Sequence, residues 1–307
     1  MDPSLNQNNL STAALLIGYK RIEFIKKRLV ELSQNTQIPI IVSIDGSDTL
    51  TEKSIVLFLK EFISKNPSMD VRYKIQDMNL GLAKHIVRAI TEVFHQFDQV
   101  IVIEDDILLS DSFINNMLLG LDILGKSSEY GVVCGFSGFK GDFILTSPVR
   151  WRASKYFSPW GWAINAKNWG KFNIHIPKEF RQELENSVSW NSLSSYRRKL
   201  WESRFTKVQS DNPHTWDFQM QYFLYKYDLD ALHTTKRISD NEGFGSIEST
   251  NTQADRPKWM SRIYVENIQM ERRFIRHSLI YVAVDAITVG GDDRLFRSVR
   301  KIFGFLK

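Results

Sequence analysis

Cysteine is almost absent from the 307-residue chain, which holds only Cys134. A single thiol excludes disulfide bonds within the chain and a cysteine-rich zinc site, and it is compatible with a reducing compartment. Long hydrophobic runs are absent as well. The apolar run 279–284 ends at Asp285, well short of the roughly 20 residues that a membrane-spanning helix needs. Residues 1–9 show no secretory-signal pattern. These absences predict a cytoplasmic protein that does not cross a membrane.

Concentrated charge, internal repeats and low-complexity segments are also absent. The 40 basic and 35 acidic residues give a net charge of +5, and the basic residues are scattered along the chain. That scatter argues against a nucleic-acid interface. The hydrophobic content of 43% and the charged content of 24% are those of an ordinary globular protein. At this length we expect one large domain, or one domain with an appendage.

Short apolar runs alternate with helical patterns in the first 106 residues. The expected strands are Thr12–Gly18, Pro39–Ile44, Val71–Ile75 and a fourth that ends at Glu104. The expected helices are Ile22–Leu32, Glu52–Ser64 and Leu82–Phe97. This alternation, with short connections, predicts an α/β fold with a doubly wound, mostly parallel, Rossmann-like sheet and helices on both faces.

The second half of the chain differs in composition, because all eight tryptophans follow residue 150. Core packing is the common explanation for a tryptophan, although a sugar-binding surface also uses flat aromatic rings. We expect one more strand at Val132–Phe136, a charged helical excursion over residues 178–208 and a helix over Trp216–Tyr227.

Three adjacent carboxylates, Glu104, Asp105 and Asp106, end the apolar run Val100–Ile103. Four apolar residues in a row are typical of a strand covered on both faces. Ligands of open α/β sheets bind beyond the carboxyl ends of the strands, and carboxylate oxygens suit hard cations such as Mg²⁺ or Mn²⁺. The acids therefore indicate a metal and phosphate site. A solvated turn that caps the next helix through Ser110-Asp111 is the competing interpretation.

Other polar residues follow the remaining strands, so the topology should bring them to the same edge. They are Arg21, Asp45, Asn79 and, one turn into the next helix, His85. An aspartate here can accept hydrogen bonds from a base or a ribose, while arginine and histidine can face a diphosphate or pyrimidine carbonyls. Taken singly, each also fits an ordinary structural role: a helix start, a turn acid or a core histidine.

Three segments, 40–45, 84–90 and 102–106, resemble N-acetylglucosaminyltransferase I and its relatives, which are inverting, metal-dependent glycosyltransferases of the GT-A fold. The resemblance runs from about residue 13 to about residue 245. It also includes 160–163, similar to the family's Gly-Trp segment on the acceptor side, and the loop residues 236–239 and 243–245. It implies a catalytic domain over 10–245, with a nucleotide-sugar half at 10–110 and an acceptor half at 111–245. A C-terminal helical extension, 246–307, would follow.

The same resemblance implies a role for each site residue. Asp106 would be the direct ligand of Mn²⁺ (or Mg²⁺), and Asp217, from a Trp-Asp pair, would be the catalytic base. Glu104 would contact the transferred sugar and Asp105 the ribose. The remaining residues expected to contact the donor are Arg21, Asp45 and His85 around the uracil, Asn79, and Ser239 at the phosphates. As a structural alternative, Asp217 sits where its charge would suit the start of a helix.

The resemblance implies transfer of a sugar from a UDP-sugar donor to a saccharide or lipid-linked saccharide acceptor. N-acetylglucosamine is the transferred sugar that it favours. Eukaryotic relatives have a membrane anchor and disulfides, so this chain is expected to be a bacterial relative. Two alternatives are a sugar nucleotidyltransferase, which needs a glycine-rich loop where residues 15–21 offer only Gly18, and a non-catalytic carbohydrate-binding protein. The basic, amphipathic segment 294–307 fits either a membrane surface at the inner face of the cell membrane or the protein's own surface.

Overall fold

The computed structural model describes residues 11–137, 151–210 and 212–244, together with 263, 265–268, 271–272 and 274–275. The strands are β1 Thr12–Gly18, β2 Ile40–Ile44, β3 Val71–Ile75, β4 Gln99–Glu104, β5 Ile107–Leu109, β6 Tyr130–Cys134, β7 Trp151–Ser154, β8 Trp162–Asn165, β9 Asp230–Thr234, β10 Ser239–Asn241 and β11 Phe274–Ile275. The helices are α1 Ile22–Asn35, α2 Thr49–Lys65, α3 Leu82–Val93, α4 Phe113–Gly125, α5 Ala166–Trp169, α6 Phe180–Leu184, α7 Val188–Asn191, α8 Ser195–Val208 and α9 Asp217–Lys226.

Within the described residues, nine strands form one sheet in the order β11-β7-β9-β6-β8-β4-β1-β2-β3. β1 pairs in parallel with β2 and β4, and β2 pairs in parallel with β3. β8 is antiparallel to both β4 and β6, so these two neighbours run in the same direction. β6 continues in parallel with β9. The predicted α/β fold with a large, mostly parallel sheet is therefore confirmed.

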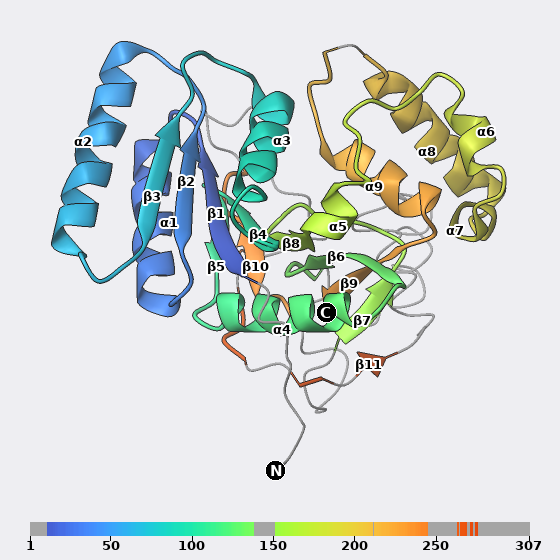
Figure 1. The fold of residues 1–307 in the computed structure, drawn as a ribbon. Coiled ribbons are helices and arrows are strands. Elements are labelled where there is room, and N and C mark those ends of the chain that lie inside the picture. Colours follow the sequence, from blue (N-terminus) through green and yellow to red (C-terminus); the bar gives the residue numbers. More distant parts are fainter. Residues whose placement is uncertain are drawn as a thin grey trace, which may run out of the picture.

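Helices cover both faces of this sheet, as Figure 1 shows, because each central strand is apolar on both sides. In β1, Ala14 and Leu16 pack into the core under α1, α2 and α4, whereas Leu15 and Ile17 pack into the core under α3 and α9. Every residue of β1 is buried. Burial on both faces is what the unbroken apolar runs of the sequence predicted.

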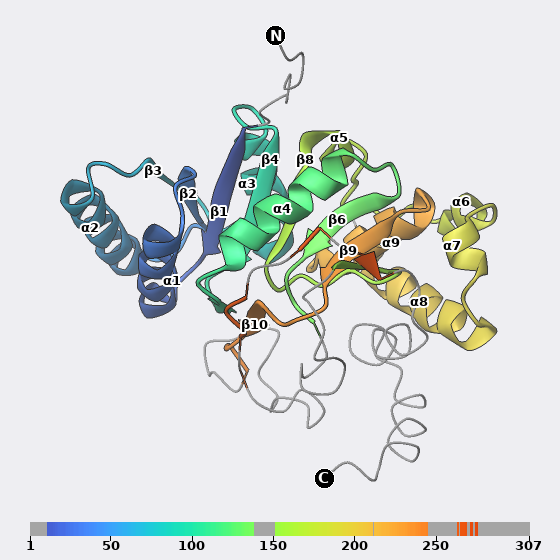
Figure 2. The same cartoon turned by 90° about the horizontal axis from the view of Figure 1, so that it is seen from below.

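A third core joins α6, α7 and α8 to the outer side of α9, beside the sheet (Figure 2). It is built mainly from aromatic side chains, including Trp190, Trp201 and Phe205. The charged helical excursion expected over 178–208 is thus present, and aromatic residues attach it to the domain. Trp151 and Trp162 are fully buried within the sheet cores, so core packing accounts for these two tryptophans.

Several element boundaries differ from the predictions by one to three residues, and two differences are larger. α3 ends at Val93, because the chain turns at residues 94–96 instead of continuing to Phe97. A short strand, β5, follows the acids and pairs with β10, and α4 begins only after Ser112. Ser110 and Asp111 therefore form the connection between β5 and α4, and Ser112 stands at the N-cap position in place of the expected pair.

The C-terminal segments 246–307 and 294–307, and Gly245, lie outside the described residues apart from the few positions given above, so the expectations for them stay predictions. Among the described residues, no helix is both long enough and apolar enough to span a bilayer.

Helix α4 lies close to the sheet at Gly120. A Cβ atom there would come within 2.5 Å of Val133 Cγ1 and 2.7 Å of Trp151 Cη2, whereas a Cβ at Gly125 would meet nothing within 4 Å. Forcing extra atoms into a packed core typically costs about 1–3 kcal/mol, while Gly→Ala in an open helical position stabilises by up to about 1 kcal/mol.

We therefore expect Gly120→Ala to lower the free energy of unfolding and Gly125→Ala, its control on the same helix, to leave it unchanged or raise it. Urea denaturation followed by circular dichroism measures both. Equal effects of the two substitutions would contradict the close approach of α4 to the sheet.

Candidate functional site

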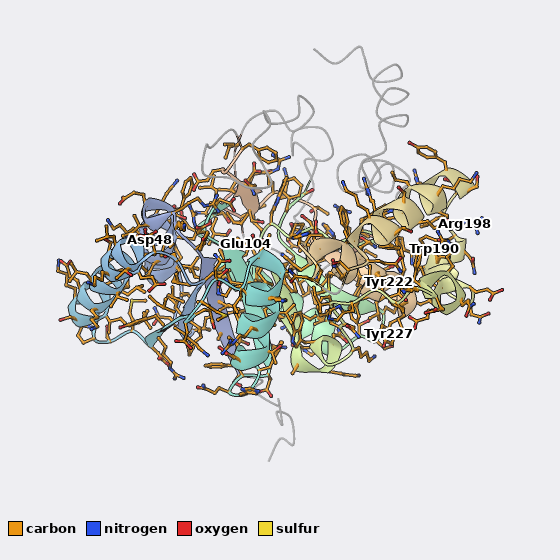
Figure 3. All side chains as sticks on the ribbon, turned by 90° about the horizontal axis from the view of Figure 1, so that it is seen from above. Asp48, Glu104, Trp190, Arg198, Tyr222 and Tyr227 are labelled. Carbon is orange, nitrogen blue, oxygen red and sulfur yellow. The ribbon has the colours of Figure 1, made fainter. Side chains whose placement is uncertain are left out.

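A cavity of about 780 Å³ lies where the carboxyl ends of β1, β2 and β4 face the start of α9. Its volume is within the range of small-molecule binding sites. Figure 3 shows Glu104 near the middle of the molecule, between the blue N-terminal elements and the helices that carry Trp190 and Tyr222. The predicted site residues that line this cavity are Arg21, Asp45, Asn79, His85, Glu104, Asp105, Asp106 and Asp217.

Arg21, at the exit of β1, holds two of the three acids at the end of β4. Its guanidinium forms an ion pair with Asp105 through both Nε and Nη2, and its Nη1 lies 3.1 Å from Asp106 Oδ2. The parallel register of β1 and β4, which aligns Ile17 with Glu104, places these groups side by side. Two-pronged contact with a carboxylate is the geometry that suits arginine.

One guanidinium does not balance three neighbouring carboxylates, of which Asp105 and Asp106 are buried and Glu104 is partly buried. Burial raises the pKa of Glu104 well above its ordinary value, and the charges of Asp106, Asp105 and Asp217 raise it further. Burial also raises the pKa of Asp105 to about 7, against the opposing effect of Arg21. The cluster is thus poised to gain from added positive charge.

Asp45 and His85 are both tied into the protein. The Asp45 carboxylate accepts hydrogen bonds from the backbone N–H groups of Leu80 at 2.8 Å and Gly81 at 3.0 Å, so it joins the end of β2 to the loop before α3. Gly81 adopts a positive φ of 76° there, a conformation that glycine reaches without strain. His85 Nε2 lies 2.8 Å from Ser43 Oγ, and burial lowers the pKa of its imidazole, which favours the neutral ring.

Asp217 begins α9 on the opposite wall of the cavity. Thr215 Oγ1 donates a hydrogen bond to Asp217 Oδ1, which fixes the carboxylate at the helix start. Burial raises the pKa of Asp217, while the Thr215 hydroxyl and the nearby Arg204 act to lower it. The result is a carboxylate that faces the acids of β4 and is less acidic than an exposed aspartate.

The segment after β10 packs directly on Asp106. Glu242 N donates to Asp106 O at 2.9 Å, and a Cβ on Gly243 would lie 2.4 Å from Asp106 Oδ2. Two cations of α1 hold this segment in place: the fully buried Arg28 forms an ion pair with Glu242, and Lys27 Nζ lies 2.7 Å from Glu242 Oε2. Helix α1 therefore anchors the backbone that confines Asp106.

Ser239 is the predicted site residue that the structure places elsewhere. It is fully buried, does not line the cavity, and donates from Oγ to Trp160 O at 2.6 Å. Its position does not fit the predicted contact with donor phosphates, because its hydroxyl is already used inside the protein. The cavity also has lining residues to which the sequence pointed weakly or not at all, namely Tyr19, Lys20, Trp160, His214 and Asn241.

A divalent cation fits this group of residues best at Asp106. Among the described residues, no three or more His, Cys, Asp or Glu side chains form a complete metal site. Mg²⁺, however, is usually held by one or two carboxylates together with ligand phosphates. Asp105 is engaged on both oxygens by Arg21, whereas Asp106 has a single contact with it. The oxygen donors and the excess of acid suit Mn²⁺ or Mg²⁺.

No protein-family model matches the sequence, and no curated protein matches it either. Solved structures offer distant likenesses. The mannosyltransferase PcManGT from Pyrobaculum calidifontis, in complex with GDP-Man and Mn²⁺, has a TM-score of 0.37 at 12% identity, with 59% of this chain and 48% of that chain covered. TarS from S. aureus has a TM-score of 0.40 at 11% identity, with 73% of this chain and 60% of that chain covered.

A putative glucose-1-phosphate thymidylyltransferase from Bacillus anthracis has a TM-score of 0.39 at 11% identity, with 76% of this chain and 90% of that chain covered. This chain thus spans 48% and 60% of the first two proteins. Likenesses this distant assign no reaction, so the function is argued from the residues of the site.

The anchoring of the segment after β10 can be tested through Glu242. Removing one partner of a buried ion pair typically costs about 3–5 kcal/mol, and Glu31 remains as a second partner of Arg28. We therefore expect Glu242→Ala to lower the free energy of unfolding by about 2–3 kcal/mol.

Glu23→Ala is the control for Glu242→Ala, because Glu23 forms only an exposed pair with Lys26, and such pairs contribute about 0–1 kcal/mol. Urea denaturation measures both variants. Similar losses in the two would contradict the anchoring role of Glu242.

Proposed function

We propose that this protein is a metal-dependent, inverting glycosyltransferase of the GT-A type that moves a sugar from a UDP-sugar to a hydroxyl group of a saccharide acceptor. One observation carries the proposal: Asp217 faces Glu104, Asp105 and Asp106 across a single cavity. The choice of uridine, and of N-acetylglucosamine as the sugar, rests on the resemblance of residues 40–45, 84–90 and 102–106 to N-acetylglucosaminyltransferase I and its relatives. Location in the cytoplasm and contact of 294–307 with a membrane surface remain predictions.

In the proposed reaction, the acceptor hydroxyl attacks the anomeric carbon of the donor sugar. Asp217 takes the proton of that hydroxyl as the new glycosidic bond forms, and the bond from the anomeric carbon to UDP breaks with its electron pair going to UDP. A general base of this kind typically contributes about 10²–10⁴ in rate. Attack from the side of Asp217, opposite to the departing diphosphate, inverts the configuration.

In the same proposed reaction, the acids of β4 bind the sugar donor. A divalent cation at Asp106 would neutralise the charge that develops on the departing diphosphate. Arg21, already beside Asp105 and Asp106, adds a fixed positive charge near that position. Glu104 and Asp105 supply hydrogen-bond acceptors for sugar and ribose hydroxyls.

The sugar nucleotidyltransferase alternative is weakened by the scarcity of glycine after β1. Residues 15–21 contain only Gly18, which lines the cavity and also packs against Ile25 of α1. A loop that cradles a triphosphate instead keeps glycines where the phosphates approach the backbone.

Calorimetric titration with UDP-N-acetylglucosamine, with and without Mn²⁺, tests the proposal. We expect binding that depends on Mn²⁺. In the presence of a saccharide acceptor mixture, Asp217→Asn should lower kcat by about 10²–10⁴ while the affinity for the donor is retained, because Asp217 acts on the acceptor proton. Asp77→Asn, at an exposed position away from the cavity, is the control. Absence of binding of any UDP-sugar with any divalent cation would overturn the proposal.

The pH dependence of kcat should report the pKa of Asp217. The base must be ionised, so the rate falls as the pH drops through this pKa, which burial raises above that of an ordinary aspartate near 4. Arg204→Gln removes a cation that lowers the pKa of Asp217, and the acid limb should therefore move to higher pH.

Lys207→Gln, at an exposed position on the same helix, is the control for Arg204→Gln and should leave the acid limb in place. A shift of the acid limb to lower pH in Arg204→Gln would rule out Asp217 as the group that limits the rate.

A further inference from the structure

A smaller pocket, of about 220 Å³, lies at the far end of α9 from Asp217. Asp217 begins this helix and Lys226 ends it, and its ten residues span about 15 Å. The walls come from the connection between α5 and α6, from α6 itself and from the last turns of α9. Figure 3 shows Tyr222 and Tyr227, two of the lining residues, apart from Glu104. No lining residue is shared with the large cavity, so the two pockets are separate.

Two lysines and one acid set the charge of the small pocket. Lys226 Nζ lies 2.7 Å from Glu183 Oε2, and the Tyr222 hydroxyl donates a hydrogen bond to the same oxygen. Lys171 has no such acid: within the described part of the chain it forms no ion pair, and its ammonium group lies 5.4 Å from the centroid of the Tyr227 ring. The pocket therefore carries a net positive charge, with one cation left unbalanced.

Polar groups beside Lys171 add hydrogen-bond donors that the protein does not use. Asn173 Oδ1 accepts from His175 N at 2.8 Å, but the Asn173 side-chain amide has no printed acceptor among the described residues. His175 Nδ1 lies 3.4 Å from Ser210 O, which leaves Nε2 for a ligand. Tyr227 is 39% exposed, and its hydroxyl group is open to a ligand as well. An anion in the pocket would thus meet donors from two walls.

The kind of donor favours a phosphate group over a carboxylate. A carboxylate is matched best by the planar fork of an arginine, and the described lining contains no arginine. A lysine ammonium group is a point charge that binds phosphate oxygens from many directions. Lys171 stands on the connection before α6 and Lys226 on α9, so two walls can contact a tetrahedral anion. The volume lies below the roughly 300–1,000 Å³ of pockets that hold drug-sized ligands, which indicates a small ligand.

We propose that this pocket is a second binding site, which holds a phosphate group between Lys171 and Lys226. The phosphate oxygens accept hydrogen bonds from both ammonium groups, and Lys226 shares its protons between the ligand and Glu183. Both ammonium groups lie within 6 Å of the centre of the Tyr227 ring, so this ring offers an apolar surface to a group attached to the phosphate. The site has no part in the proposed transfer reaction and does not depend on it.

Calorimetric titration of the full chain, without nucleotide or metal ion and at constant ionic strength, tests the site. The probes are inorganic phosphate, phenyl phosphate and benzoate. Phenyl phosphate should bind about tenfold more tightly than benzoate, because a phosphate monoester carries more charge and more acceptor oxygens than a carboxylate. Both phosphates support the site by binding. Tighter binding of phenyl phosphate identifies the natural ligand as an ester, and tighter binding of inorganic phosphate identifies it as the free ion.

Lys171→Gln should weaken the binding of phosphate about three- to tenfold, because it removes the unbalanced cation. Lys167→Gln is the matched control, since Lys167 is exposed on α5 and does not line the pocket. It makes the same change of charge and should bind phosphate as the wild type does.

Glu183→Gln should act in the opposite direction and tighten the binding of phosphate about two- to fivefold. The substitution removes a like charge and releases Lys226 from its ion pair, while glutamine still accepts a hydrogen bond from Tyr222. Glu185→Gln, at an exposed position just after α6, is the control and should leave the affinity unchanged. A variant that merely unfolds cannot bind more tightly, so this prediction separates charge from loss of structure.

Amide NMR spectra recorded during the phosphate titration locate the site. Shifts are expected at residues 171–175 and 226–228. Shifts confined to residues 19–21 and 104–106 would place the phosphate in the large cavity and overturn the second site. Unchanged affinity in Lys171→Gln, weaker binding in Glu183→Gln, or no binding of either phosphate would overturn it too. A failure to bind UDP-sugars overturns only the proposed function, because the two pockets share no residue.

Discussion

The mutual repulsion of three carboxylates at the end of β4 is the constraint around which the rest of the site is arranged. Arg21 reaches across from β1 to hold Asp105 and Asp106, and the backbone after β10 closes over Asp106 from the other side. Burial nevertheless raises the pKa of Glu104 and Asp105. Such a cluster is unfavourable by itself, and it becomes favourable when a cation and its ligand complete it.

The sequence predicted this part of the site well because it depends on local patterns. Unbroken apolar runs followed by polar residues locate strands and their ends, and parallel strands bring their carboxyl ends to one edge. Arg21, Asp45 and Glu104 could therefore be placed together without a structure. Asp217 was reached by resemblance and not by pattern, since an acid in a first helical turn has an ordinary structural explanation.

Residues whose roles depend on distant contacts could not be predicted in the same way. Arg28 is one arginine among many in the sequence, and only the fold shows that it is fully buried and paired with Glu242. Ser239 was expected at the donor phosphates, yet β10 turns its hydroxyl towards Trp160. The short strand β5 was missed because its partner, β10, lies about 130 residues further along the chain.

The hydrogen bond from Ser239 to Trp160 has a mechanical consequence. β10 is paired with β5, which directly follows the acids, and Trp160 lines the cavity. Ser239, through a hydrogen bond of 2.6 Å to Trp160 O, therefore fixes this part of the cavity wall to the strand pair beside the acids. In the proposed reaction, a cavity wall that is fixed before binding would lower the entropy lost when donor and acceptor are brought into position.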